Sequence, residues 1–266
     1  MSYADSNGVS FYYDEQGEGE GEPLVLLHGG IASGEMFASL APALAAAGRR
    51  VIRIDLQGHG RTGDVNRPFD VAAMADDVAG VLGQFGGQVD LLGYSLGGAV
   101  ALRLALQHPE LVTDLILVSI AIKRSGNHPE VIAAMDGMTA EAAEFIKPSP
   151  PGQFYAANAP DPDGWDMLIA KTSDALKDDY DWSDEVRSLK PRTLLVFADA
   201  DSIRPDHIAE FYGLLGGGLA DAGWDGSNQP ANQLATLPGR SHYDLLESPL
   251  LAPVVTGFLQ SSSSPQ

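Results

Sequence analysis

The sequence contains no cysteine, few basic residues and no long apolar run. Without cysteine the chain forms no disulfide bond, no thiolate metal site and no cysteine nucleophile, and a zinc ion would need histidine and carboxylate ligands alone. No uninterrupted apolar run reaches the roughly 18 residues of a membrane-spanning helix. The opening residues 1–10 also lack the basic and apolar regions of a signal peptide. We therefore expect a soluble, cytoplasmic protein.

Positive charge is scarce, because 16 basic residues face 36 acidic ones and the formal net charge is −20 at pH 7. Such a surface repels the phosphate backbone of nucleic acids and the face of an anionic membrane. We therefore expect neither as a partner. Hydrophobic residues make up 44% of the 266 positions, which is enough to bury the core of one large domain or two small ones.

Apolar strand-like runs alternate with helix-like segments over most of the chain. Asn7-Gly8 lies between two short β-prone segments and predicts a hairpin. Such alternation is typical of a mostly parallel sheet with helices on both faces. The expected strands are 23–27, 51–56, 89–92, 115–119, 193–197 and 233–237, and the expected helices are 36–47, 71–85, 96–107, 205–215 and 249–259.

The alternation stops between residues 121 and 190, where no buried strand is predicted. Helical patterns at 130–145 and 165–176 are separated there by two proline-containing stretches, 148–151 and 160–163. This segment therefore reads as an insertion. The last residues, 261–266, are too polar to pack, and we expect a disordered tail.

Ser95 stands between Gly93 and Gly97, where a strand pattern changes into a helix pattern. In that setting Gly-x-Ser-x-Gly is typical of a nucleophile elbow, which presents the serine hydroxyl on a strained turn. The N-terminus of the following helix supplies free N–H groups where negative charge develops. The alternative is a plain turn, because glycine and serine are common turn residues. We predict that Ser95 is a catalytic nucleophile.

A serine nucleophile needs a base and an acid that orients the base. Asp199 and Asp201 follow the run at 193–197, and His242 follows the last predicted strand. Catalytic groups gather at the carboxyl edge of such sheets, so these residues are the candidates. Either aspartate can serve, and the other is then a loop or helix-capping residue. The remaining histidines receive other roles: packing for His59, and the surface for His108, His128 and His207.

Together these segments resemble the α/β-hydrolase fold superfamily, in its cap-bearing form, over nearly the whole chain. The matching motifs are Leu26-Leu27-His28-Gly29-Gly30, Asp55-Leu56-Gln57-Gly58-His59-Gly60, Gly93-Tyr94-Ser95-Leu96-Gly97-Gly98, and Ala198-Asp199-Ala200-Asp201 with Gly239-Arg240-Ser241-His242. The resemblance implies an α/β core made of residues 1–121 and 190–260, with a mostly parallel central sheet flanked by helices. It also implies that residues 122–189 form a helical cap.

The resemblance further implies the roles of single residues. It favours Asp201 as the acid, because Asp201 precedes Pro205 by four positions as in the family, although Ala198 replaces the usual glycine. The backbone N–H groups of Gly30 and Leu96 form the oxyanion hole. The residue His28 is then structural.

A serine nucleophile, in place of the aspartate of epoxide hydrolases and haloalkane dehalogenases, implies acyl chemistry with no cofactor or metal. We expect a small or medium carboxylic ester or a lactone as substrate. Other reactions on this fold stay open: C–C bond hydrolysis, cofactor-free perhydrolase or haloperoxidase chemistry, and acyl transfer. A ligand receptor is less favoured, because a receptor needs no complete triad. The cap's apolar side chains either line a substrate pocket or pack the cap on the core; they are Met135, Met138, Phe154, Tyr155, Trp165 and Met167.

Overall fold

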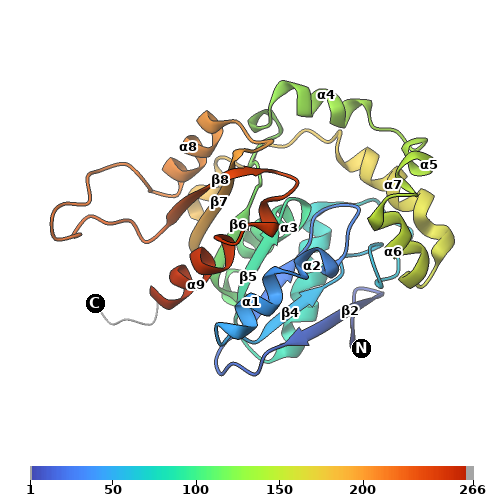
Figure 1. Ribbon diagram of the computed structural model, residues 1–266, viewed down its shortest axis with the longest axis horizontal. Helices are drawn as coiled ribbons and strands as arrows, with labels where there is room; N and C mark the ends of the chain where they lie inside the picture. Colours follow the sequence, from blue (N-terminus) through green and yellow to red (C-terminus); the bar gives the residue numbers. More distant parts are fainter. Residues whose placement is uncertain (1, 262–266) are drawn as a thin grey trace.

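The computed structural model describes residues 2–261 and is built around one eight-stranded sheet (Figure 1). The strand order is β1-β2-β4-β3-β5-β6-β7-β8, with β1 and β2 antiparallel to their neighbours and the pairs from β4 to β8 parallel. This confirms the predicted mostly parallel sheet. The strands are β1 Ser2–Ser6, β2 Val9–Gln16, β3 Leu24–Leu27, β4 Val51–Ile54, β5 Val89–Tyr94, β6 Val112–Val118, β7 Arg192–Ala200 and β8 Gln233–Ser241.

The predicted hairpin joins β1 to β2. Asn7 and Gly8 have φ values of 46° and 82°, and the flanking residues pair in antiparallel register from Ser6 with Val9 to Ser2 with Tyr13. Two consecutive positive φ values are the signature of a tight turn that Asn-Gly adopts at little cost. This local signal is why the sequence alone located the hairpin.

Helices cover both faces of the sheet. On the face that carries Leu24 and Leu26 lie α1 (Leu40–Ala46) and α9 (Leu251–Ser261). On the face that carries Val25 and Leu27 lie α2 (Val71–Leu82), α3 (Leu96–Gln107) and α8 (Pro205–Leu214). Alternate residues of a strand point to opposite faces, so a strand covered on both sides must be apolar throughout. The continuous apolar runs of the sequence therefore became the buried strands.

The segment between β6 and β7 is helical and lies beyond the upper right end of the sheet in Figure 1. Its helices are α4 Pro129–Gly137, α5 Ala142–Ile146, α6 Pro150–Asn158 and α7 Trp165–Ala175. The sequence predicted two helical pieces here; the first, 130–145, is divided into α4 and α5, and α6 was missed. Pro150 and Pro151, read as a separator, instead occupy the start of α6, where proline is favoured because the first N–H groups of a helix have no partner.

Two further predicted boundaries were wrong. The expected helix at 36–47 is a short 3₁₀ turn, Gly34–Phe37, followed by α1, because Pro42 fits only near a helix start. The expected tail begins too early, since Ser261 is the last residue of α9; the rest of that tail, 262–266, lies outside the described residues. Within residues 2–261, none of the helices has the length and apolar character needed to cross a bilayer.

Candidate active site

Ser95 lies between the end of β5 and the start of α3, at φ 52° and ψ −118°. Residues other than glycine rarely adopt a positive φ, so the backbone at Ser95 is strained. The strain is held by hydrogen bonds: the Ser95 N–H donates to the Val118 carbonyl at 3.0 Å, and the Ala99 N–H donates to the Ser95 carbonyl at 3.0 Å. Among residues 2–261 the Ser95 hydroxyl has no hydrogen-bond partner, and the residue is half-buried. The hydroxyl is therefore free to react.

The glycines of this turn permit very close packing. A Cβ on Gly93 would lie 2.2 Å from the Gly97 carbonyl oxygen, and a Cβ on Gly97 would lie 2.2 Å from the Leu27 carbonyl oxygen. Both contacts are with backbone, which cannot rotate away. The turn therefore requires glycine at both positions, as the sequence pattern indicated.

Gly97→Ala is expected to destabilise the fold by about 3 kcal/mol, or a fall in Tm of roughly 6 to 12 °C, because the added methyl meets backbone of β3. The matched control is Gly257→Ala in α9, where a Cβ meets nothing within 4 Å. That change is expected to raise stability by up to about 1 kcal/mol, from the better helix propensity of alanine. Thermal unfolding of the two variants beside the wild type measures both effects, and an unchanged Tm for Gly97→Ala would contradict the first.

His242 and Asp201 come together from two different strand ends. The Nδ1 atom of His242 lies 3.3 Å from Oδ1 of Asp201, whose side chain is 1% exposed. Burial raises the pKa of the Asp201 carboxyl, but hydrogen bonds from His242, Ser119 and the Ala198 N–H outweigh this effect, and the net pKa lies below its usual value. Asp201 is therefore ionised beside the imidazole.

Tyr94 connects this pair to the serine turn. Its phenol donates a hydrogen bond to the His242 carbonyl, and its ring centroid lies 5.3 Å from that of His242. The ring of the exposed Tyr243 approaches His242 at 5.4 Å, edge to face. Because Tyr94 directly precedes Ser95, the His242 loop is held against the end of β5.

Asp199 has a different environment. Its exposed carboxylate accepts hydrogen bonds from the Gly239 N–H at 2.9 Å and the Arg240 N–H at 3.1 Å, and these bonds lower its pKa. The contacts lie where the pairing of β7 with β8 shifts register. Asp199 thus fastens the end of β8, while Asp201 faces the imidazole.

Three residues that are not glycine have left-handed backbones in loops that follow neighbouring strands. They are Ile31 after β3, Ser95 after β5 and Ser119 after β6, at φ values of 56°, 52° and 55°. Such strain persists only where surrounding contacts enforce it, and it gathers at functional sites. Ser119 donates its hydroxyl to Asp201 Oδ2, a contact that the sequence analysis missed. A lone serine at the end of a strand carried no signal for it.

The predicted oxyanion residues are adjacent, since a Cβ on Gly30 would lie 3.8 Å from Leu96 Cδ2. His28 holds the loop before Gly30: its Nδ1 lies 2.7 Å from the Gly29 carbonyl, and its Nε2 accepts a hydrogen bond from the Leu56 N–H at 3.0 Å. Burial lowers the pKa of His28 to about 4, so the imidazole is neutral and carries its proton on Nδ1.

The other histidines follow the expectations with one exception. His59 is fully buried, packs on Phe69 and has a pKa lowered by burial to about 3. His108 is partly exposed and contacts Asp76, and the half-buried His128 precedes α4. The residue His207 was expected at the surface but is fully buried. The start of the inserted segment covers it, and its Nε2 accepts a hydrogen bond from the Ile122 N–H at 3.2 Å.

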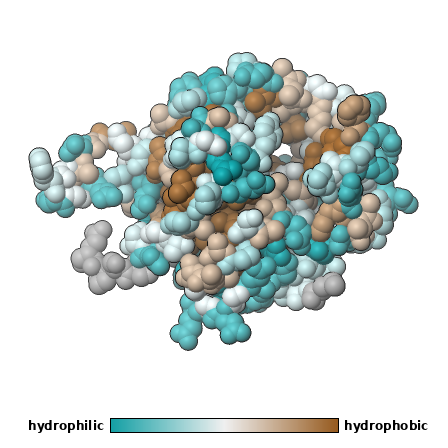
Figure 2. Space-filling view, in the orientation of Figure 1, coloured by the Kyte–Doolittle hydropathy of each residue, from teal (hydrophilic) through white to brown (hydrophobic). Residues whose placement is uncertain are grey.

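The cap side chains proposed for a pocket divide into three groups. Tyr155 and Trp165 are buried, pack on each other at 5.5 Å and belong to the core cluster, so they fill the inserted segment. Met167 in α7 is 54% exposed, so it does not pack the inserted segment on the core. Half-buried side chains remain as candidates to line the pocket: Met135, Met138 and Phe154. In Figure 2 apolar residues gather where the inserted helices face the core, and the surface is hollowed there.

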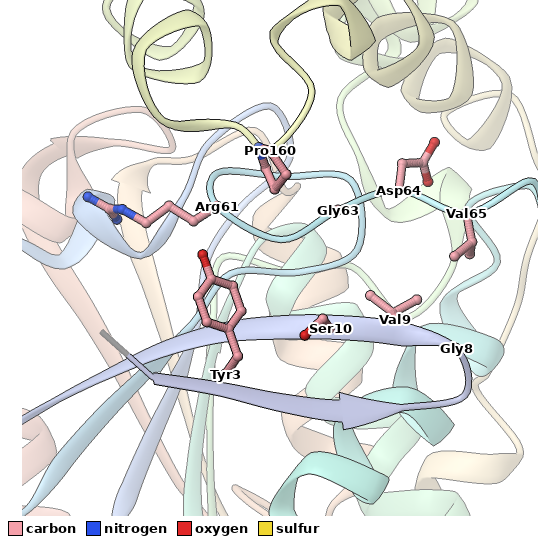
Figure 3. A pocket seen from close by; sticks show the side chains of 9 residues that line it. All are labelled: Tyr3, Gly8, Val9, Ser10, Arg61, Gly63, Asp64, Val65 and Pro160. Atoms are coloured by element: carbon pink, nitrogen blue, oxygen red, sulfur yellow. The ribbon is translucent and has the colours of Figure 1, made fainter.

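A separate open hollow of about 420 Å³ lies between the β1–β2 hairpin, the loop around Arg61 and Pro160 (Figure 3). The guanidinium beside this hollow stacks on Tyr12 at 4.7 Å and on Phe154 at 4.8 Å. Arg61 therefore joins the core to α6. Within residues 2–261, no group of three or more His, Cys, Asp or Glu side chains is placed to hold a metal ion.

The chain is similar to known proteins in sequence and in fold. A family model of the alpha/beta hydrolase fold matches residues 22–164. Over 206 residues the chain is 34% identical to a pimeloyl-(acyl-carrier protein) methyl ester esterase of Neisseria meningitidis, covering 70% of this chain and 77% of that protein. Over 133 residues it is 35% identical to the sn-1-specific diacylglycerol lipase ABHD11 of Danio rerio, covering 49% of this chain and 42% of that protein. A thermophilic esterase from Thermogutta terrifontis has a similar structure, with a TM-score of 0.70 and 20% identity. The match covers 98% of this chain and 99% of that protein.

Proposed function

We propose that this chain, which belongs to the alpha/beta hydrolase fold family, works through a Ser95–His242–Asp201 triad and an acyl-enzyme. Within the family it is a carboxylic-ester hydrolase. The observation that carries the proposal is the buried Asp201 carboxylate at 3.3 Å from His242 Nδ1. The strained Ser95 supports it, because the preceding Tyr94 donates a hydrogen bond to the His242 carbonyl. The predicted cytoplasmic location is part of the proposal.

In this mechanism His242 takes the proton of the Ser95 hydroxyl as the oxygen attacks the ester carbonyl. Asp201 holds the imidazole and stabilises its charged form. The Gly30 and Leu96 N–H groups bind the oxyanion of the tetrahedral intermediate, at about 3 kcal/mol per donor. His242 then protonates the leaving alcohol, and water, activated by the same imidazole, hydrolyses the acyl-enzyme.

The charge of the inserted segment bears on the substrate. Residues 122–189 carry thirteen acidic and six basic side chains. Three of the basic ones are already paired with carboxylates: Lys123 with Glu210, Arg124 with Asp136 and Lys171 with Asp64. A partner or substrate with negative charge is therefore repelled at this segment. The proposed substrate is a small, uncharged carboxylic ester or lactone with an apolar part, rather than an ester borne by an acidic carrier.

An ester panel tests this proposal, with methyl hexanoate and monomethyl adipate as a matched pair that differs in one carboxylate. At low salt we expect kcat/KM to be about tenfold or more higher for the neutral ester, because the acidic surface repels the anion. Raising the salt concentration should narrow the difference through screening. The panel also contains p-nitrophenyl butyrate, a lactone and a β-diketone.

The outcomes separate the parts of the proposal. Equal kcat/KM for the two methyl esters would overturn the charge argument alone. Cleavage of the β-diketone without cleavage of any ester or lactone would replace ester hydrolysis by C–C bond hydrolysis.

A further inference from the structure

Ser202 lies between the two residues that orient the base. Its hydroxyl oxygen is 3.0 Å from His242 Nδ1 and 3.4 Å from Asp201 Oδ1, whereas the direct distance between Nδ1 and Oδ1 is 3.3 Å. The hydroxyl is thus closer to the imidazole than the carboxylate is. A direct charge-assisted pair would be closer, at about 2.7 to 2.9 Å.

The donors and acceptors allow Ser202 to bridge the imidazole and the carboxylate, beside the direct contact of Nδ1 with Oδ1. Nδ1 of His242 must carry the proton if Nε2 is to accept one from Ser95. The Ser202 oxygen can accept from Nδ1–H and donate its own hydrogen to Asp201 Oδ1. That carboxylate is fixed from other sides by Ser119, by the Ala198 N–H at 2.9 Å and by the Ile203 N–H at 3.3 Å.

The backbone of the same residue is joined to the inserted segment. The His128 N–H donates to the Ser202 carbonyl at 3.0 Å, and the Arg204 N–H donates to the Gly126 carbonyl at 2.9 Å. An antiparallel bridge pairs Asn127 with Ile203 between these two bonds. His128 directly precedes α4, whose half-buried face contains Val131, Ile132 and Met135. A shift of α4 therefore acts on Ser202 directly.

We propose that Ser202 is a positioning residue that couples α4 to the catalytic imidazole. Its hydroxyl keeps His242 in the Nδ1–H tautomer and in register with Ser95, and its carbonyl makes this alignment depend on the position of α4. The inference rests on the proposed triad. It assigns to the inserted segment an influence on the rate of the chemical step, in addition to contact with the substrate.

Ser202→Ala is the first test, with Ser202→Thr as the variant that keeps the hydroxyl. For the alanine variant we expect kcat for p-nitrophenyl butyrate to fall about tenfold with KM within about twofold, the pattern of lost alignment in the transition state. The acidic limb of the kcat/KM profile against pH should move to lower pH, because the lost oxygen accepts a hydrogen bond from the charged imidazole. The threonine variant should restore both values. A purely structural role would move Tm and leave the pH profile unchanged.

His128→Pro and His128→Ala form a second, backbone test. His128 has φ −62° and ψ 146°, and the preceding Asn127 has φ −75° and ψ 158°, which suit a proline and the residue before it. Only the proline variant loses the N–H bound to Ser202. We expect its kcat to be about fivefold below that of His128→Ala, with less than additive loss when combined with Ser202→Ala.

These results separate the inference from the proposed function. If Ser95→Ala is inactive while Ser202→Ala keeps the wild-type kcat and pH profile, the coupling is overturned and the triad stands. If Ser202→Ala does not fold, equal kcat values for the two His128 variants overturn the coupling. If Ser95→Ala is as active as the wild type, the proposed function fails first.

Discussion

Ser95→Ala is expected to lower kcat for p-nitrophenyl butyrate by about 10⁴- to 10⁶-fold, because it removes the only atom that can form the acyl-enzyme in the proposed mechanism. Residual hydrolysis should come from the oxyanion hole and substrate binding alone. Steady-state hydrolysis at neutral pH measures the effect. The fold should be retained, since the φ of 52° at Ser95 is no harder for alanine than for serine.

A fluorophosphonate probe gives an independent readout of the same atom. The wild type should be labelled at Ser95 and Ser95→Ala should not. The matched control is Ser188→Ala, at an exposed serine whose hydroxyl donates to the Glu185 carbonyl at 2.7 Å. It should be labelled at Ser95 like the wild type. Equal hydrolysis by the wild type and Ser95→Ala would remove Ser95 from the mechanism.

Asp201→Asn is expected to lower kcat by about 10³- to 10⁴-fold, because an amide no longer stabilises the imidazolium and favours the wrong imidazole tautomer. Asp199→Asn is the matched control, two residues away, and should stay within about threefold of the wild type because the exposed Asp199 carboxylate binds the Gly239 and Arg240 N–H groups. Hydrolysis by both variants under identical conditions compares them. A larger loss for Asp199→Asn would make Asp199 the acid.

The stability difference between the wild type and Asp201→Asn should also depend on pH. The folded pKa of Asp201 lies below its usual value, so its contribution to stability is complete above the unfolded pKa of about 3.9. This contribution is lost as the pH falls through the lowered folded pKa. The difference in Tm between the wild type and Asp201→Asn should therefore be constant near neutral pH and shrink below about pH 4. A difference that grows toward acid pH would contradict the assignment.

Local patterns in the sequence were sufficient for the sheet, the hairpin and the serine turn. Each has a signal in residues close together in the chain: the continuous apolar run of β3, Asn7-Gly8 with positive φ at both residues, and the glycines at 93 and 97 on either side of Ser95. The sequence also placed Ser95, Asp201 and His242 at one edge of the sheet, because each residue lies just beyond a predicted strand.

Contacts between distant segments were decided only by the tertiary structure. Asp199 is the next-to-last residue of β7 and Asp201 follows the strand, and only the register of β7 with β8 decides which carboxylate meets His242. Ser119 and Ser202 acquire their roles from partners that their own neighbours do not reveal, and the burial of His207 depends on the inserted segment that crosses it. The physical reason is that sequence periodicity gives the face on which a side chain lies, whereas its partner depends on how separate elements pack.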